Sequence, residues 1–195
     1  METERAGLPI RAFADLVAWE TWLAAEPRSS RGVWLKLAKA SAGVPSVSKA
    51  DAIDGALCHG WIDGQLNPFD ESWWLIRFTP RKPRSKWSEK NRTRAIELIA
   101  AGRIAAAGQA EIDAAKADGR WDAAYAPQST VTVPDDLAAA LDAEPGARAF
   151  FDQLDSANRY AILYRVHEAK KPATRAARIA KFVGMCARSE RVHQG

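Results

Sequence analysis

The stretch WIDGQLNPFDESWWLIRF, residues 61–78, decides the fold, because apolar residues alternate with other residues on both sides of a turn-forming Asn-Pro pair at 67–68. This pattern predicts two strands joined as a hairpin. Alternation places every second side chain on the same face of a strand. The residues expected on the core face are Ile62, Leu66, Trp74, Ile76 and Phe78.

Charged and aromatic side chains fall on the second face of this predicted hairpin. If the two core faces coincide, Asp63 lies directly or diagonally across from Arg77. The alternating segment VWLKL, residues 33–37, adds a further strand to the same face. The predicted aromatic–charged face consists of Trp34, Lys36, Trp61, Asp63, Trp73 and Arg77. Two interpretations stay open: a small-ligand pocket lined by aromatic walls, or a second core layer with Asp63–Arg77 as a structural ion pair.

Helical periodicity surrounds these strands. The pattern predicts a helix over 13–25, and Ser48 and Ser88 are suitable N-caps for helices that end near Gly60 and Gly102. Another helix is predicted over 105–119, and a linker over 125–133 precedes a wholly helical remainder. The predicted fold is therefore α+β: a small antiparallel sheet with flanking helices, followed by a C-terminal helical bundle. The expected domains are 1–127 and 128–195.

The charge of the chain is unevenly distributed. The formal net charge is +4, yet residues 77–94 hold eight Lys and Arg against one acid, and residues 159–191 hold nine against two. The rest of the chain is acidic. Two basic blocks in an acidic body indicate either an anionic partner or pairing with the body's own carboxylates.

The first basic block has the composition of a nucleic-acid contact, because an aromatic residue is interleaved with cations. The candidate anion-binding residues are Arg81, Lys82, Arg84, Lys86, Trp87 and Lys90. The prolines at 80 and 83 favour the other interpretation, an extended connector with solvated charges whose Trp87 anchors the following helix to the core.

Catalytic and metal-binding motifs are not apparent. Cys58 and His59 are adjacent on a predicted helix, where neighbouring side chains diverge, so a nucleophile–base pair is not expected. The three histidines are far apart in sequence, and neither phosphate-loop pattern occurs. The sequence therefore predicts no catalytic residue, no metal site and no cofactor.

Two parts of the chain resemble a known family. The segments CHGWIDGQ (58–65) and RFTPRKPRSKWSEKNR (77–92) are similar to the YdeI/OmpD-associated family, also called bacteriocin-protection proteins. The segments at 133–154 and 158–183 resemble the C-terminal helical region of that family. The resemblance implies a small α+β N-terminal part and a helical C-terminal part. It also implies a loose link to envelope stress and antimicrobial-peptide resistance, without catalytic residues or a cofactor.

The functional expectation combines these points. No apolar run reaches the roughly 20 residues of a membrane span, and the N-terminus lacks a signal-peptide pattern, so a cytoplasmic protein without membrane insertion is expected. We expect a non-enzymatic accessory protein that binds an unidentified protein or anionic partner. The alternatives are a nucleic-acid-binding module that uses both basic blocks, and a small-molecule-binding protein or enzyme that uses the aromatic–charged face. The sequence does not indicate an oligomeric state.

Overall fold

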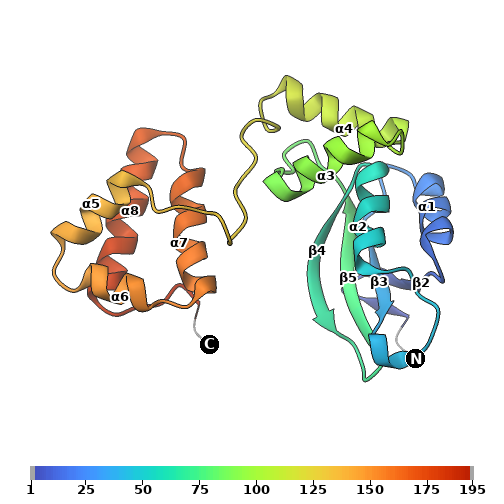
Figure 1. The fold of residues 1–195 in the computed structure, drawn as a ribbon, viewed down its shortest axis with the longest axis horizontal. Coiled ribbons are helices and arrows are strands. Elements are labelled where there is room, and N and C mark those ends of the chain that lie inside the picture. The colour runs from blue at the N-terminus through green and yellow to red at the C-terminus, as the bar shows by residue number, and fades with distance from the viewer. Residues whose placement is uncertain (1–2, 194–195) are drawn as a thin grey trace. The chain divides into compact units, whose positions relative to one another are not determined.

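The computed structural model describes residues 3–193, and the chain divides into two compact units, one ending at Ala124 and the other beginning at Tyr125 (Figure 1). The N-terminal unit contains β1 (Glu4–Arg5), β2 (Leu8–Ala12), α1 (Leu16–Ala25), β3 (Val33–Ala38), a short 3-10 helix (Ala40–Ala42), α2 (Lys49–Cys58), β4 (Trp61–Pro68), β5 (Trp73–Pro80), α3 (Glu89–Ala100) and α4 (Ala106–Ala117). The C-terminal unit contains α5 (Asp135–Ala143), α6 (Ala147–Gln153), α7 (Ser156–Glu168) and α8 (Pro172–Ala187). The predicted α+β class is confirmed.

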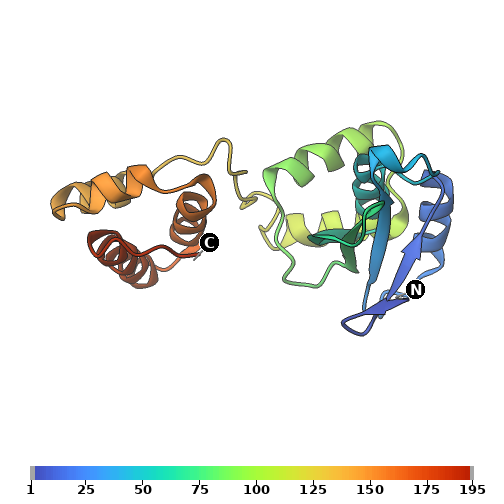
Figure 2. The same cartoon turned by 90° about the horizontal axis from the view of Figure 1, so that it is seen from below.

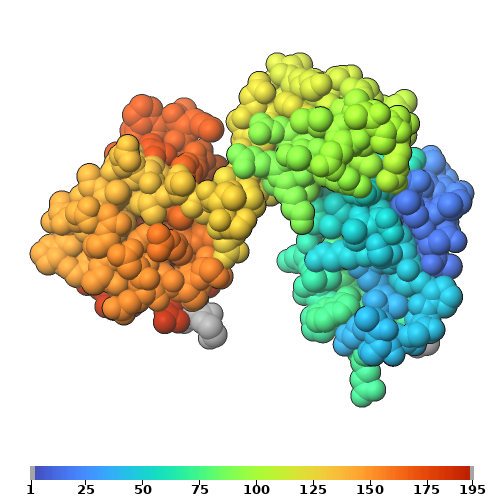
Figure 3. All heavy atoms as spheres, in the orientation of Figure 1, coloured from blue at the N-terminus to red at the C-terminus, as the bar shows by residue number. Residues whose placement is uncertain are grey.

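The sheet is mixed, whereas the sequence predicted an antiparallel one. Its strand order is β1-β2-β3-β5-β4. Three strand pairs are antiparallel, but β2 pairs with β3 in parallel. The reason is the intervening α1, since a parallel pair needs a crossover connection and a helix is its usual form. The turn between β4 and β5 projects from this unit (Figure 3).

Local capping explains where several helices begin. The side chains of Asp15, Ser48 and Ser88 accept hydrogen bonds from backbone N–H groups three residues on, at 2.8, 3.1 and 3.1 Å. Each bond satisfies one of the N–H groups left without a partner in the first helical turn. The two caps predicted at Ser48 and Ser88 are therefore confirmed, while the first helix begins at Leu16 rather than at Phe13.

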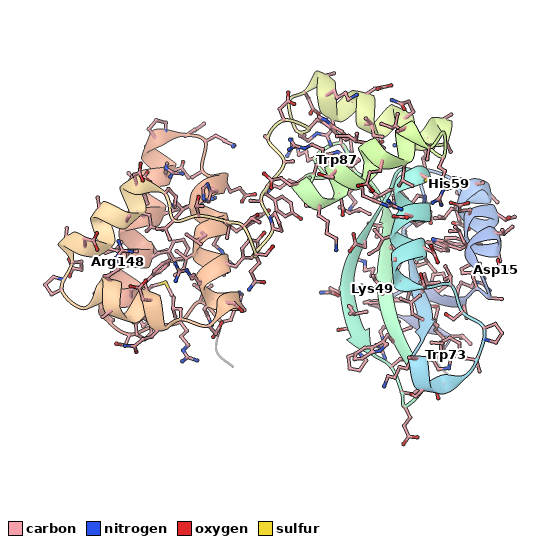
Figure 4. The ribbon with its side chains drawn as sticks, viewed as in Figure 1. Asp15, Lys49, His59, Trp73, Trp87 and Arg148 are labelled. Atoms are coloured by element: carbon pink, nitrogen blue, oxygen red, sulfur yellow. The ribbon has the colours of Figure 1, made fainter. Side chains whose placement is uncertain are left out.

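Three apolar clusters stabilise the N-terminal unit, the smallest of which consists of Leu8, Trp34 and Leu75 on the second face of the sheet. Helices α1 and α2 pack on one face of the sheet, where Trp19 and Ala56 contact the strand residues Leu35 and Phe78. Helices α3 and α4 form a second cluster near the C-terminal end of α2, built around Trp87 (Figures 1 and 4). All eight tryptophans of the chain fall between residues 19 and 121, so tryptophan fluorescence reports on this unit.

The C-terminal unit consists of the helices α5, α6, α7 and α8, which Figure 2 draws in orange to red. Leu137, Phe151, Ile162 and Phe182 bring α5, α6, α7 and α8 to one apolar core. In α8 the predicted apolar stripe of Ile179, Phe182, Val183 and Cys186 is buried. Within the described part of the chain, no helix has the length and apolar character needed to cross a membrane.

Candidate functional site

The predicted aromatic–charged face is only partly correct. Trp34 lies directly opposite Arg77, and Lys36 opposite Leu75, so these residues share one face of the sheet with Trp73. Asp63, however, lies directly opposite Phe78, whose side chain is on the helix-covered face. Trp61 also belongs to the core under α1 and α2. The predicted Asp63–Arg77 pair is therefore wrong, and so is the pocket wall expected from Trp61 and Asp63.

A β-bulge in β4 causes this difference. Asp63 pairs with Phe78 and Leu66 pairs with Ile76, so three steps along β4 span two steps along β5. The extra residue reverses which side chains of β4 face the core. Leu66 therefore shares the face of Ile76 as predicted, although it is 44% exposed, whereas Trp61 and Asp63, which precede the bulge, are on that face as well. Ile62, which was expected on the core face, lies opposite Thr79 on the second face. Alternation alone cannot locate such an insertion.

Lys36 and Trp73 form a compact group of their own on the second face. The Lys36 ammonium lies 4.5 Å from the centre of the Trp73 ring and 4.8 Å from that of Phe69. Trp73 stands near the β4–β5 turn, at the opposite end of the sheet from Trp87 (Figure 4). These cation–π contacts attract the Lys36 ammonium to the two rings.

A cleft opens at the other end of this second face, with a volume of about 670 Å³. Its walls come from the β1–β2 turn, the loop between α1 and β3, and the end of β5 with the residues that follow. The lining residues are Ala6, Leu8, Arg28, Ser29, Ser30, Arg31, Trp34, Gln65, Arg77, Thr79, Pro80, Arg81, Lys82 and Pro83. We call this site the basic cleft. It combines residues from the predicted aromatic–charged face with residues from the predicted anion-binding set.

The charge of the basic cleft is one-sided. Five of its lining residues are Lys or Arg, and none of the described lining residues is Asp or Glu. Arg28 forms an ion pair with the buried Glu111 of α4. No described carboxylate forms an ion pair with Arg31, Arg77 or Lys82. A concave site in which several cations have no carboxylate partner attracts an anionic ligand.

Glycines shape the walls of the basic cleft. Gly32 has a φ of +112°, and a Cβ there would lie 2.4 Å from the carbonyl oxygen of Phe78. This close approach sets the cationic loop 28–31 directly against β5. Gly7 has a φ of +72°, and a Cβ there would lie 3.2 Å from a guanidinium nitrogen of Arg31. Gly32 therefore lets the cationic loop approach β5, and Gly7 lets the β1–β2 turn approach Arg31.

The second predicted set, the candidate anion-binding residues, is divided by the structure. Arg81 and Lys82 line the basic cleft, while Arg84, Lys86 and Lys90 are exposed outside it. Trp87 is only 2% exposed and packs edge-on against Trp121, with ring centres 4.8 Å apart. A buried ring cannot stack on a base, so the anchoring interpretation of Trp87 is the correct one.

The basic block at 159–191 is largely paired within its own unit. Five of its arginines have a carboxylate partner within 4.0 Å: Arg159, Arg175, Arg178, Arg188 and Arg191. Arg175 is the best placed, with Nε 2.6 Å from Asp136, and this guanidinium holds the pKa of the Asp136 carboxyl below its usual value. Internal pairing, one of the two interpretations of the block, therefore accounts for much of its charge.

The segment that sequence reasoning missed is RSSRG, residues 28–32. It supplies two of the five cations and two hydroxyl groups to the basic cleft. In the sequence, this segment is recognisable only as two arginines that flank two serines, followed by a glycine immediately before a strand. Short basic loops of this kind are common on surfaces, so only their position beside β5 distinguishes this one.

Cys58 and His59 do not form a catalytic pair. They lie at the end of α2, and among the described residues no hydrogen bond joins their side chains. Burial raises the pKa of the Cys58 thiol to about 11, and burial lowers the pKa of His59. A thiol of this kind is a poor nucleophile at neutral pH. Within residues 3–193 no three His, Cys, Asp or Glu side chains gather where they would hold a metal ion.

Alkylation kinetics test this description of Cys58. In a Cys186→Ala background, we expect iodoacetamide to modify Cys58 at about pH 8 more than a hundredfold more slowly than free cysteine, because only roughly one thiol in a thousand is ionised. The rate should rise about tenfold per pH unit up to about pH 11. The raised pKa also means that the thiol's contribution to stability is present below the ordinary pKa and is lost as the pH rises toward 11. Rapid modification near about pH 6 would contradict this account.

Comparison with known families divides the chain in two. The model of the family described as "Domain of unknown function (DUF8412)" matches residues 11–111, slightly more than half of the 195 residues. The model of the family described as "Bacteriocin-protection, YdeI or OmpD-Associated" matches residues 130–189. The expected family is thus confirmed for the C-terminal segments, and the segments at 58–65 and 77–92 fall within the other match. No curated protein and no solved structure matches the chain.

Proposed function

This chain belongs to the DUF8412 family and carries a bacteriocin-protection, YdeI or OmpD-associated domain, and we propose that it is a non-enzymatic accessory protein. We propose from its basic cleft that it binds a multiply charged anion. It works in the cytoplasm and contributes to protection against bacteriocins and envelope stress. The binding site is the basic cleft in the N-terminal unit. The observation that carries the proposal is a cleft with five cationic lining residues, of which Arg31, Arg77 and Lys82 have no carboxylate partner among the described residues.

The cleft has the dimensions and chemistry of a binding site for a small molecule. Its volume of about 670 Å³ falls within the range of roughly 300–1,000 Å³ that such sites occupy. The planar guanidinium groups of Arg31 and Arg77 match phosphate and carboxylate groups, which accept two parallel hydrogen bonds.

Nucleic-acid binding is the weaker candidate. The exposed Lys82, Arg84 and Lys90 favour it, because none of them has a carboxylate partner among the described residues. The buried Trp87 and the paired arginines of the C-terminal unit argue against it. Any such binding would be electrostatic and independent of sequence, and it would weaken steeply with salt.

Titration with inorganic pyrophosphate tests the proposed site. We expect binding at about 0.01 M ionic strength that weakens but persists at about 0.15 M, because charges in a cleft are screened less than exposed ones. Arg77→Ala should weaken binding about 10- to 100-fold, since a hydrogen bond to a charged group contributes about 1.5–3 kcal/mol. Calorimetry measures the affinity, and tryptophan fluorescence checks it because Trp34 lines the cleft.

Lys49→Ala is the matched control. It removes one exposed cation at the start of α2, outside the cleft (Figure 4), and so changes the net charge by the same amount. Its pyrophosphate affinity should equal that of the wild type. Equal losses in both variants would show attraction to the general surface charge and would contradict a specific cleft. Absence of pyrophosphate binding at low ionic strength would also overturn the proposal.

A further inference from the structure

The cations of the basic cleft come from two segments of the chain. This arrangement indicates the shape of the ligand as well as the sign of its charge. Arg28 and Arg31 belong to the loop that follows α1, whereas Arg77, Arg81 and Lys82 belong to β5 and the residues after it. The close approach of Gly32 to Phe78 holds the two segments together. Two groups of donors in one cleft suit a ligand with two linked anionic groups.

The charge balance indicates how much negative charge the ligand carries. Arg28 is already balanced by Glu111, while Arg31, Arg77 and Lys82 have no carboxylate partner among the described residues. Three exposed cations are therefore available to bind the negative charges of a ligand. A phosphate monoester supplies about 1.5–2 negative charges at pH 7, which is too little, whereas a diphosphate ester supplies about three.

Neutral donors and an apolar wall complete the site. The hydroxyl groups of Ser29, Ser30 and Thr79 and the side-chain amide of Gln65 line the cleft and can donate to phosphate oxygens. The remaining lining residues are apolar and form a wall in which Ala6 and Pro83 are exposed, while Leu8, Trp34 and Pro80 are buried behind them. Inorganic pyrophosphate has no group that would use this wall, and burial of apolar surface would favour a ligand that does.

We infer that the ligand of the basic cleft is an organic diphosphate, with its diphosphate on the cationic side and its organic substituent against the apolar wall. This inference rests on the proposed function, since it specifies the anion that the same cleft takes. Nucleoside diphosphates and prenyl diphosphates both have this chemistry. The shared feature is a diphosphate joined to a largely apolar or aromatic group.

Competition among four probes tests the inference on the full chain: inorganic phosphate, inorganic pyrophosphate, adenosine diphosphate and farnesyl diphosphate. We expect pyrophosphate to bind at least tenfold more tightly than phosphate. At least one organic diphosphate should bind at least tenfold more tightly than pyrophosphate. Whichever of adenosine diphosphate and farnesyl diphosphate binds more tightly shows whether the ligand is a nucleoside or a prenyl diphosphate. Farnesyl diphosphate is kept below its micelle-forming concentration, and calorimetry measures each affinity.

The variant Pro83→Ser tests the contribution of the apolar wall to affinity separately from that of the cations. Pro83 is exposed and lines the cleft, so its replacement should weaken the organic diphosphate about three- to tenfold and leave pyrophosphate unchanged. Pro45→Ser, at an exposed proline outside the cleft, should change neither affinity. Lys82→Ala should weaken both ligands about tenfold or more.

The outcomes distinguish this inference from the proposed function. If pyrophosphate binds as tightly as both organic diphosphates, the organic substituent has no site and the inference is wrong, while the proposed anion cleft stands. If no diphosphate binds, both are wrong. If a single-stranded oligonucleotide displaces the organic diphosphate and binds more tightly at about 0.15 M ionic strength, the ligand is a nucleic acid and the inference is overturned.

Discussion

Replacing Gly32 by alanine is expected to lower the free energy of unfolding of the N-terminal unit by about 2–5 kcal/mol and to abolish pyrophosphate binding in the basic cleft. Two costs combine. The φ of +112° is strained for any residue with a side chain. The new methyl group would also lie 2.4 Å from the Phe78 carbonyl oxygen and 2.7 Å from the Thr79 methyl group, so the loop must move away from β5.

Urea unfolding followed by tryptophan fluorescence measures the stability change, because every tryptophan is in the N-terminal unit. Gly43→Ala is the control, since Gly43 also has a positive φ, +63°, but has no atom within 4 Å of the added methyl group. It should cost only the backbone strain, about 1–2 kcal/mol, and leave binding unchanged. Equal effects in the two variants would show that the contact between the loop and β5 has no special role.

Trp19→Ala should be the most destabilising side-chain truncation in the N-terminal unit, at about 3–5 kcal/mol. The Trp19 side chain is fully buried, and its indole nitrogen donates a hydrogen bond of 3.0 Å to the carbonyl oxygen of Ala52. Its ring also packs against Trp22 and Phe78, with centres 5.3 and 5.2 Å away. Truncation therefore removes the main contact that holds α1 to both α2 and the sheet.

Trp74→Ala is the matched control for Trp19→Ala. Trp74 is 39% exposed and contacts Lys39 on the surface. Its loss should cost less than about 1 kcal/mol, in keeping with surface substitutions. The midpoint of urea unfolding, followed by the fluorescence of the seven remaining tryptophans, compares the two variants. A similar small shift for both would show that the aromatic cluster around Trp19 does not organise this core.

Several features of this protein follow from short-range sequence signals. The caps at Ser48 and Ser88 are local, because the hydroxyl group and its N–H partner are three residues apart. The buried stripe of α8 needs only the helical repeat to be recognised. The first two strands were missed because they are short, two and five residues, and too mixed in composition to show alternation.

The candidate site was only partly predictable, because only some of its residues belong to a local sequence pattern. Trp34 and Arg77 were correctly assigned to one face, since β3 and β5 pair without interruption over six residues. Arg81 and Lys82 were selected from their charge, and both line the cleft. Arg28 and Arg31 were missed because their loop carries no pattern that distinguishes it from other polar surface loops.

By itself, the sequence of this protein determined the α+β class, the helical C-terminal part, the family resemblance and the basic character of residues 77–94. Only the tertiary structure decided which charges meet. The bulge between Asp63 and Leu66 moved Asp63 away from Arg77, and the contact of Gly32 with Phe78 placed Arg31 in the same cleft as Arg77. Both features depend on how the chain packs against segments ten or more residues away, and local periodicity carries no information about that packing.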